Sequence, residues 1–272
     1  MTIRGPLGIA GVGLIGGSIA MRARKAGIEV VGYDSRAPAA NVIDRKVDSL
    51  EALASATRVL AIALPLDATL AAIDTLQAID APRLELILDV ASVKAPVVER
   101  TSDWRRFVAT HPIAGAELSG SAAAREDLFE GRVWTYVPRD SERDAAIAAF
   151  IEMMGARPFP IEAGAHDRAL AMTSHLPQVV VSALAALLSE REIAPELAGS
   201  GLASTLRLAG SPWEIWEPIL EANGAVLGAA LRELANRLEG LADDVEAGTL
   251  RLSESYFESA RAAYEAFVKP WR

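Results

Sequence analysis

Short apolar runs alternate with amphipathic segments up to about Pro160. Each short apolar run predicts a β-strand, and the longer segments between them predict helices. The run 58–64 (RVLAIAL) is continuous, which is typical of a strand buried on both faces, and after Pro65 we predict Asp67 as the N-cap of the next helix. The expected strands are 7–10, 29–33, 58–64, 84–90, 107–110 and 133–137, and the first expected helix is 14–26. Strands that alternate with helices predict right-handed crossovers and a doubly wound parallel sheet.

A different pattern begins after Pro160. Alanine- and leucine-rich helical periodicity runs from Gly164 to Phe267 without an intervening strand pattern. Breaks in it are expected at Pro195, around Gly199 and Gly201, and at Ser211-Pro212. We therefore predict an α/β domain over residues 1–163 and an all-helical domain over residues 164–272.

Composition and charge narrow the class of protein. Of the 272 residues, 51% are hydrophobic, which is enough for a sizeable core. The 36 acidic residues outnumber the 27 basic ones, giving a net charge of −9, so a nucleic-acid partner is not expected. The absence of cysteine excludes disulfides, thiolate metal sites and a cysteine nucleophile. The acidic stretch 233–246 predicts the solvated face of a helix.

The sequence also carries expectations about location and assembly. The longest apolar stretch, 172–188, contains His175, Pro177 and Gln178, and we expect it to be too short to span a bilayer. No charged segment followed by an apolar run opens the chain, so we expect no signal peptide and a cytoplasmic protein without a membrane partner. The apolar helix around residues 179–188 is expected to bury part of its surface against a second copy of the chain.

A glycine-rich turn follows the first predicted strand. Gly11, Gly13 and Gly16 have the G-x-G-x-x-G spacing, with Leu14 and Ile15 at the start of the predicted helix. The first glycine permits the tight turn, the second lets the backbone approach a pyrophosphate, and the third lets the helix pack on the strand. The helix N-terminus then offers N–H groups to the phosphates. Such a triplet also occurs in ordinary turns, but its position between strand and helix favours a dinucleotide site.

The end of the second predicted strand supports that interpretation. Asp34 lies there, 23 residues after Gly11, where a carboxylate can accept hydrogen bonds from both ribose hydroxyls. Its charge favours NAD. Arg36 could instead bind the 2′-phosphate of NADP or be an ordinary loop residue. We expect NAD, with NADP as the alternative, and include Ser35 and Arg36 in the cofactor site.

Few side chains are suited to move a proton. The histidines are His111, His166 and His175, and most single histidines in proteins are structural. His111 follows a predicted strand at its carboxyl end, where ligands bind in open α/β sheets. His175 lies near the start of an apolar helix, where a polar ring needs a partner. Arg207, amid apolar neighbours, either reaches solvent or binds a carboxylate.

Lysine is absent where some related architectures use it. Some two-domain nicotinamide enzymes with a helical second domain have an acid/base lysine there, but none lies between Lys94 and Lys269. An imidazole, with a pKa near 6.5, is the natural replacement.

In several segments the chain resembles the prephenate/arogenate (cyclohexadienyl) dehydrogenases. The similar segments are the glycine motif with Gly17-Ser18, 89–94 (DVASVK), 111–120 (HPIAGAELSG), 128–131 (LFEG), His166-Asp167, 174–178 (SHLPQ) and 207–211 (RLAGS) leading to Trp216. They run in order over nearly the whole chain, and the H-P-I-A-G and S-H-L-P segments are far more specific than the glycine motif. The resemblance implies a Rossmann domain followed by a helical substrate-binding and dimerisation domain, and hence a homodimer.

The resemblance also implies a reaction. It is the NAD(P)-dependent oxidative decarboxylation of prephenate to 4-hydroxyphenylpyruvate, or of arogenate to tyrosine, in tyrosine biosynthesis. It further implies residue roles. His111 matches the catalytic histidine that accepts the proton of the ring hydroxyl, and Ser92 matches the serine that orients that hydroxyl and the nicotinamide. The implied substrate-binding residues are His175, Arg207, Glu117 and Trp216, of which Arg207 matches the one that binds a substrate carboxylate.

The sequence departs from the family pattern at two positions, and two other functions remain as alternatives. Ala116 stands where threonine or serine is common, and Leu206 where threonine precedes the arginine. Neither removes a catalytic group. No fused chorismate mutase or regulatory domain is expected. The first alternative is another nicotinamide-dependent enzyme of similar architecture, such as a β-hydroxyacid dehydrogenase or an imine reductase. The second is a non-catalytic NAD-binding protein, which would leave Ser92, His111, His175 and Arg207 without a role.

Overall fold

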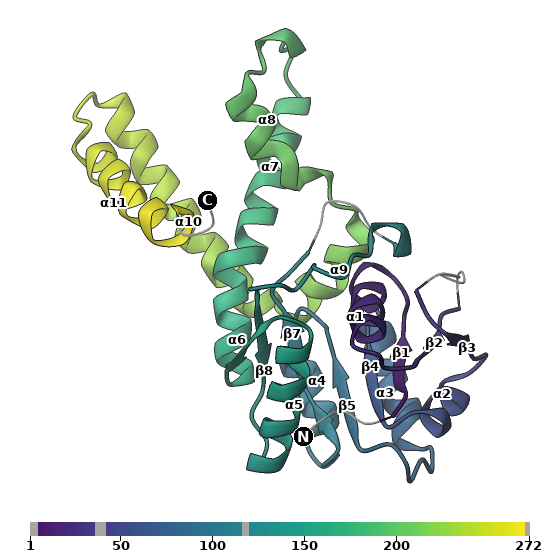
Figure 1. Ribbon diagram of the computed structural model, residues 1–272. Helices are drawn as coiled ribbons and strands as arrows, with labels where there is room; N and C mark the ends of the chain where they lie inside the picture. The colour runs from purple at the N-terminus through teal and green to yellow at the C-terminus, as the bar shows by residue number, and fades with distance from the viewer. Residues whose placement is uncertain (1–4, 36–41, 116–119, 270–272) are drawn as a thin grey trace. The chain divides into compact units, whose positions relative to one another are not determined.

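The computed structural model describes residues 5–35, 42–115 and 120–269 (Figure 1). It divides into two compact units, Met1–Gly224 and Ala225–Arg272, which are described separately. The predicted boundary between residues 163 and 164 follows the change from α/β to helical sequence and stays a prediction.

A parallel sheet forms the centre of the first unit, as predicted. Its strand order is β3-β2-β1-β4-β5-β6, and every neighbouring pair is parallel. The strands are β1 (Leu7–Ala10), β2 (Val30–Tyr33), β3 (Arg45–Lys46), β4 (Val59–Ile62), β5 (Leu86–Asp89) and β6 (Phe107–Val108). The helices that follow them are α1 (Leu14–Lys25), α2 (Leu50–Ala56), α3 (Leu66–Gln77) and α4 (Ala95–Thr101). This is the doubly wound, Rossmann-type arrangement that the alternating pattern indicated.

Alternating side chains of the sheet build two separate cores. Ile9 and Ala61 pack with α1 and α5 (Ser141–Met153) in one cluster, whereas Leu60 and Ile62 pack with α2, α3 and α4 in the other. Because both faces are covered, β1 and β4 are buried at every position. This burial explains why the run 58–64 is apolar without alternation.

The N-cap predicted for α3 was wrong. Pro65, not Asp67, is the N-cap residue, and Asp67 lies in the first turn of the helix. Its carboxylate still lies near the positive end of the helix dipole. Side-chain caps do occur at α2, where Ser49 accepts a hydrogen bond from the N–H of Ala52, and at α5, where Asp140 accepts one from Arg143.

The expected strand 107–110 is in fact the junction of two strands. β6 ends at Val108, and β7 (Thr110–Pro112) leaves the parallel sheet to pair antiparallel with β8 (Val133–Tyr136). β8 also pairs parallel with β9 (Arg157–Pro160), and together they form a second, three-stranded sheet. His111 therefore lies within a strand and not just past one.

The remaining part of the first unit is helical. α6 (Ala163–Leu170), a π-helical turn (Ala171–His175) and α7 (Leu176–Ser189) follow one another without a break, and Figure 1 draws α6 and α7 as one rod. Short 3₁₀ turns (Ser121–Ala123, Pro195–Leu197 and Arg207–Gly210), α8 (Ser200–Leu206) and α9 (Trp213–Ala222) complete it. The predicted breaks at Pro195 and Ser211-Pro212 are confirmed. Of the break expected around Gly199 and Gly201, Gly199 is the N-cap at which α8 begins, whereas Gly201 lies inside the helix.

The helical run 163–189 is longer than the apolar stretch seen in the sequence. Its 27 residues make it long and apolar enough to cross a membrane by length and composition, so the expectation that it is too short was wrong. Only 22% of its apolar window is buried, but the run contains His166, Asp167 and His175, all buried and hydrogen-bonded within the first unit.

The described residues of the second unit form two helices, α10 (Gly224–Glu246), which begins at the last residue of the first unit, and α11 (Arg251–Phe267). Asp244 accepts hydrogen bonds from the N–H and Oγ of Ser253 and from Thr249 Oγ1, so it fastens the turn between the helices. These bonds lower the pKa of Asp244 to about 2, the hydrogen bond from Thr249 contributing most. Glu233, Glu239, Asp243 and Glu246 are exposed, which confirms the solvated acidic face.

Candidate active site

The glycine turn has the geometry of a phosphate-binding loop. Gly11 has φ +92°, and a Cβ there would strike the carbonyl of Ala63. A Cβ on Gly16 would strike the carbonyl of Gly11, so both positions require glycine. Gly13, the N-cap of α1, faces open space and carries no side-chain cap, and the first turn of α1 has no acidic residue. A phosphate can therefore approach the N–H groups that begin at Leu14 and Ile15.

Asp34 lies beside this turn. It follows β2 directly, and its Oδ2 accepts a hydrogen bond of 2.8 Å from the N–H of Val12. The carboxylate is half-buried and Ser35 is exposed. These positions fit a dinucleotide whose pyrophosphate lies on the turn and whose ribose reaches the end of β2. The predicted contribution of Arg36 lies outside the described residues.

The end of β5 brings the candidate catalytic residues to the same edge of the sheet. Asp89, the last residue of β5, accepts a hydrogen bond of 2.9 Å from the N–H of Thr110 at the start of β7. His111 therefore lies next to the end of β5, although its strand belongs to the other sheet. Ser92 is half-buried in the loop after β5. It does not cap α4, because the N-cap of that helix is Lys94.

His111 is held on two sides. Its carbonyl accepts a hydrogen bond of 3.0 Å from Thr135 Oγ1 on β8, and its Nδ1 lies 3.0 Å from Nε2 of His166 on α6. Burial lowers the pKa of the His111 imidazole well below 6.5, and the nearby basic groups of His166, Lys94 and His175 lower it further. His111 is thus neutral at pH 7 and able to accept a proton.

His175 lies at the end of the π-helical turn, a distortion that often marks a functional position. The ring is buried, and its Nδ1 lies 3.2 Å from Nδ2 of Asn223. Within the described part of the chain, Nε2 has no hydrogen-bond partner. Trp216 packs edge-on against the ring, with centroids 6.1 Å apart, and donates a hydrogen bond of 2.8 Å from Nε1 to Ser211. A buried ring nitrogen without a partner suits a polar ligand.

Arg207 begins the 3₁₀ turn after α8 and is exposed. Gln178 on α7 donates a hydrogen bond of 2.9 Å to the carbonyl of Leu208, which ties this turn to the helix that carries His175 three residues earlier. The predicted residues His175, Arg207 and Trp216 therefore belong to one connected group of helices. Glu117 lies outside the described residues.

Sequence reasoning missed several polar residues of this region. Lys94 and Asp89 form an ion pair with both side chains buried. Asp167, next to His166, accepts hydrogen bonds from the N–H groups of Lys94 and Ala95 and so caps α4. Residues 89–94 and His166-Asp167 lie in segments that carry the family resemblance, so the sequence did offer a signal that could have pointed to them. Asn223 had no such signal.

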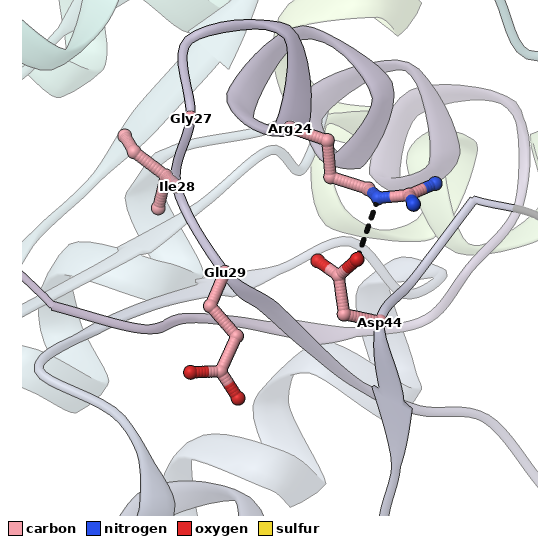
Figure 2. A pocket seen from close by; sticks show the side chains of 5 residues that line it. All are labelled: Arg24, Gly27, Ile28, Glu29 and Asp44. Carbon is pink, nitrogen blue, oxygen red and sulfur yellow. Dashed lines mark hydrogen bonds and ion pairs between the residues drawn. The ribbon is translucent and has the colours of Figure 1, made fainter.

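One surface hollow lies elsewhere. It has a volume of about 440 Å³ and is lined by Arg24, Gly27, Ile28, Glu29 and Asp44. Figure 2 shows the ion pair of 2.9 Å between Arg24 and Asp44 beside it. The hollow lies where the chain enters β2, at the amino edge of the sheet, so it is not the candidate site.

Comparisons with known proteins agree with this geometry. The family model "Prephenate dehydrogenase, nucleotide-binding domain" matches residues 19–158, and "Prephenate dehydrogenase, dimerization domain" matches residues 162–256. A probable prephenate dehydrogenase of Streptomyces niveus is 32% identical over 86% of this chain and 67% of its own length. A cyclohexadienyl dehydrogenase of Zymomonas mobilis is 32% identical over 84% of each chain.

Solved structures extend the likeness to three dimensions. Prephenate dehydrogenase from A. aeolicus, crystallised with hydroxyphenyl propionate and NAD+, has a TM-score of 0.86 at 25% identity, covering 97% of this chain and 98% of that one. Arogenate dehydrogenase from Synechocystis has a TM-score of 0.82 at 25% identity, covering 97% and 100%. A 3-hydroxyisobutyrate dehydrogenase from Salmonella typhimurium, with a TM-score of 0.57 at 12% identity over 85% and 88%, shares the fold alone. With both family models matched in order along its length, the chain belongs to the prephenate dehydrogenase family.

Proposed function

We propose that the protein oxidatively decarboxylates a cyclohexadienol, prephenate or arogenate, in tyrosine biosynthesis, with NAD as the hydride acceptor. The family is one of oxidoreductases, and the first unit contains its nucleotide-binding domain. The observation that carries the proposal is His111. It is a neutral imidazole, held by His166, at the sheet edge where the glycine turn would hold the cofactor.

The reaction needs a base at the ring hydroxyl. His111 accepts the hydroxyl proton while the hydride on the same ring carbon leaves for the cofactor. When bound, the nicotinamide supplies the redox chemistry. Loss of the ring carboxylate as carbon dioxide then makes the ring aromatic, and the phenolate oxygen takes up a proton, which balances the one that His111 accepted. Aromatisation makes the step irreversible.

The other residues bind and orient. Ser92, half-buried beside the end of β5, orients the hydroxyl and the nicotinamide. Arg207 binds a substrate carboxylate, which a guanidinium can hold with two parallel hydrogen bonds. His175, through its buried Nε2, and Trp216 contact the substrate, as does Glu117. The cofactor is held by Gly11, Gly13, Leu14, Ile15, Gly16, Asp34, Ser35 and Arg36.

The two candidate substrates differ in one group of the side chain. Prephenate carries a keto group where arogenate carries an ammonium. The test is absorbance at 340 nm with purified protein, supplying each substrate in turn with NAD or with NADP. We expect the absorbance to rise with NAD and one of the two substrates. An unchanged absorbance in all four combinations, with folded protein that binds NAD, would overturn the assigned reaction.

We also propose that the protein is a cytoplasmic homodimer that associates through its helical part. A dimerization-domain model matches residues 162–256, and large apolar side chains there are exposed, among them Leu187, Leu197 and Phe257. Exposed apolar surface of this kind is typical of a subunit interface. Light scattering at micromolar concentration should give twice the chain mass of 28.8 kDa, and a monomeric mass would refute the dimer.

A further inference from the structure

A chain of buried polar groups connects the two pocket histidines from behind. It runs from His111 to His166 and Asp167, and from Asp167 through Asn223 to His175. All of its members are buried except His111, which is half-buried. Because each link has one donor and one acceptor, the direction of every hydrogen bond can be worked out from a fixed end.

Asp167 provides that fixed end. Its Oδ1 accepts a hydrogen bond of 2.7 Å from the N–H of Lys94, and its Oδ2 accepts one of 2.8 Å from the N–H of Ala95. Burial would raise the pKa of Asp167, but the hydrogen bonds from His166 and from the two N–H groups outweigh it and lower the pKa below 3.8. The side chain is therefore an ionised carboxylate that only accepts.

The carboxylate dictates the tautomer of His166, and His166 that of His111. Nδ1 of His166 lies 2.8 Å from Oδ1 of Asp167 and must donate, so in the neutral ring Nε2 is the acceptor. The nitrogen 3.0 Å from this acceptor is Nδ1 of His111, which must donate in turn. The proton of His111 is thus on Nδ1, and the lone pair is on Nε2.

Asn223 places the proton of His175 on the other ring nitrogen. The backbone carbonyl of Asp167 lies 2.8 Å from Nδ2 of Asn223, and since a carbonyl only accepts, the amide nitrogen must face it. The same nitrogen has a second N–H, 3.2 Å from Nδ1 of His175. That ring nitrogen therefore accepts, and the proton of His175 is on the buried Nε2, which has no partner among the described residues.

We propose that His166, Asp167 and Asn223 are positioning residues that hold His111 and His175 in opposite neutral tautomers. His111 presents a lone pair on Nε2 and can accept the proton of a hydroxyl. His175 presents an N–H on Nε2 and can donate to a carbonyl or carboxylate oxygen of the same ligand. The use of these groups rests on the proposed function, but the tautomers themselves do not.

An imidazolium at His166 would reverse the arrangement. If His166 were an imidazolium, its Nε2 would donate to Nδ1 of His111, and the proton of a neutral His111 would move to Nε2. His111 could then accept no proton at that nitrogen. A measurement of ring protonation distinguishes the two arrangements.

The test is ¹⁵N NMR of the folded protein labelled in its histidines, at pH 8. The chain has only three histidines, so each ring can be assigned by a single substitution. We expect His111 and His166 with the proton on Nδ1 and His175 with the proton on Nε2. A proton on Nε2 of His111, or on Nδ1 of His175, in the unmodified protein would overturn the proposal.

Three variants test the cause, and a fourth, Thr57→Val, is the control. In His166→Gln, the glutamine Oε1 can lie near the former position of His166 Nε2 and still accept a hydrogen bond from His111, so His111 should keep its tautomer. His166→Leu removes the acceptor, and His111 should become a mixture of tautomers. Asn223→Leu should release His175 alone. Thr57→Val removes an equally buried hydrogen bond, from Thr57 Oγ1 to Leu53, and should change no histidine.

Kinetics provide the second measurement. His166→Leu should lower kcat by on the order of 10–10³-fold with little change in KM, and His166→Gln should restore most of the loss. Asn223→Leu should mainly raise KM. Equal losses in His166→Gln and His166→Leu would indicate a purely structural role for His166 and contradict the proposal. Correct tautomers in a protein inactive towards both substrates would overturn the proposed function and leave this inference standing.

Discussion

Lys94 and Asp89 form an ion pair in which neither side chain reaches solvent. Lys94 Nζ also donates a hydrogen bond of 2.6 Å to the carbonyl of Thr110, while Asp89 accepts from the N–H groups of Thr110 and Ala91. The pair therefore fastens the end of β5 to the start of β7, one residue before His111. Its ammonium is also one of the charges that keep His111 neutral.

Replacing Lys94 should be costly. Lys94→Met leaves the Asp89 carboxylate buried without its partner, and we expect the free energy of unfolding to fall by about 3–5 kcal/mol. The measurement is urea unfolding followed by circular dichroism. Lys25→Met is the matched control, because Lys25 pairs with Glu126 at the surface and should contribute roughly 0–1 kcal/mol. Equal effects of the two substitutions would contradict the importance of burial.

The pH dependence of the rate should reveal the lowered pKa of His111. Burial, followed by the nearby basic groups of His166 and Lys94, disfavours the protonated ring, so kcat/KM should stay constant as the pH falls through 6.5 and decline only below it. His111→Asn should lower kcat by on the order of 10²–10⁴-fold and remove this decline from the residual rate. A decline centred above pH 6.5 would contradict the assignment.

Stability should depend on pH in the same range. His111 and His175 both have a folded pKa below 6.5, so the unfolded chain binds protons first as the pH falls. Their contribution is complete above pH 6.5 and is lost as the pH drops through the lowered values. Asp167, with a pKa below 3.8, loses its contribution only in stronger acid. The melting temperature should therefore fall between pH 7 and 5, and less steeply in His111→Asn. Parallel curves for the two proteins would contradict the linkage.

Loss of Arg207 should weaken substrate binding. Arg207→Ala removes a charge-assisted contact to a carboxylate that is present in both ground and transition states, so KM should rise by roughly 10–100-fold with kcat little changed. Arg207→Lys keeps the charge without the two-pronged geometry and should be intermediate. Arg100→Ala, which removes a surface pair with Asp74, is the control. An unchanged KM in Arg207→Ala would refute the role.

The sequence predicts the elements that local patterns determine. β1, α1 and β2 follow from apolar runs and the glycine spacing, and Asp34 lies beside the turn as its position after β2 indicated. The division between β6 and β7 could not be predicted. The apolar run continues through Ala109, and only pairing with β8 decides where the chain leaves the parallel sheet.

The same distinction applies to the candidate site. His111 and His175 could be singled out by residue type and by their place in the predicted elements. The hydrogen bonds that pair them with other residues could not be predicted, because 55 residues separate His111 from His166, and 48 separate His175 from Asn223. A hydrogen bond over such distances depends on how α6 and α9 pack against the sheet, which no local pattern specifies.

The glycine turn offers a test that separates folding from cofactor binding. In Gly16→Ala the added methyl meets the carbonyl of Gly11 and lies 3.0 Å from atoms of Ala63 and Ile9, so overpacking should destabilise the fold by about 1–3 kcal/mol. In Gly13→Ala the methyl meets no protein atom within 4 Å, and stability should change by about 1 kcal/mol or less.

Gly13→Ala, which should barely change stability, should nevertheless weaken cofactor binding. The methyl of Gly13→Ala occupies the space through which a pyrophosphate approaches the N-terminus of α1. Titration calorimetry should therefore show a Kd for NAD that is at least about tenfold higher, which corresponds to about 1.4 kcal/mol of binding free energy. The variant should melt at the same temperature as the unmodified protein. If Gly13→Ala binds NAD with unchanged affinity, the open space at Gly13 is not the phosphate site, because no other consequence of that methyl could compensate for a blocked approach.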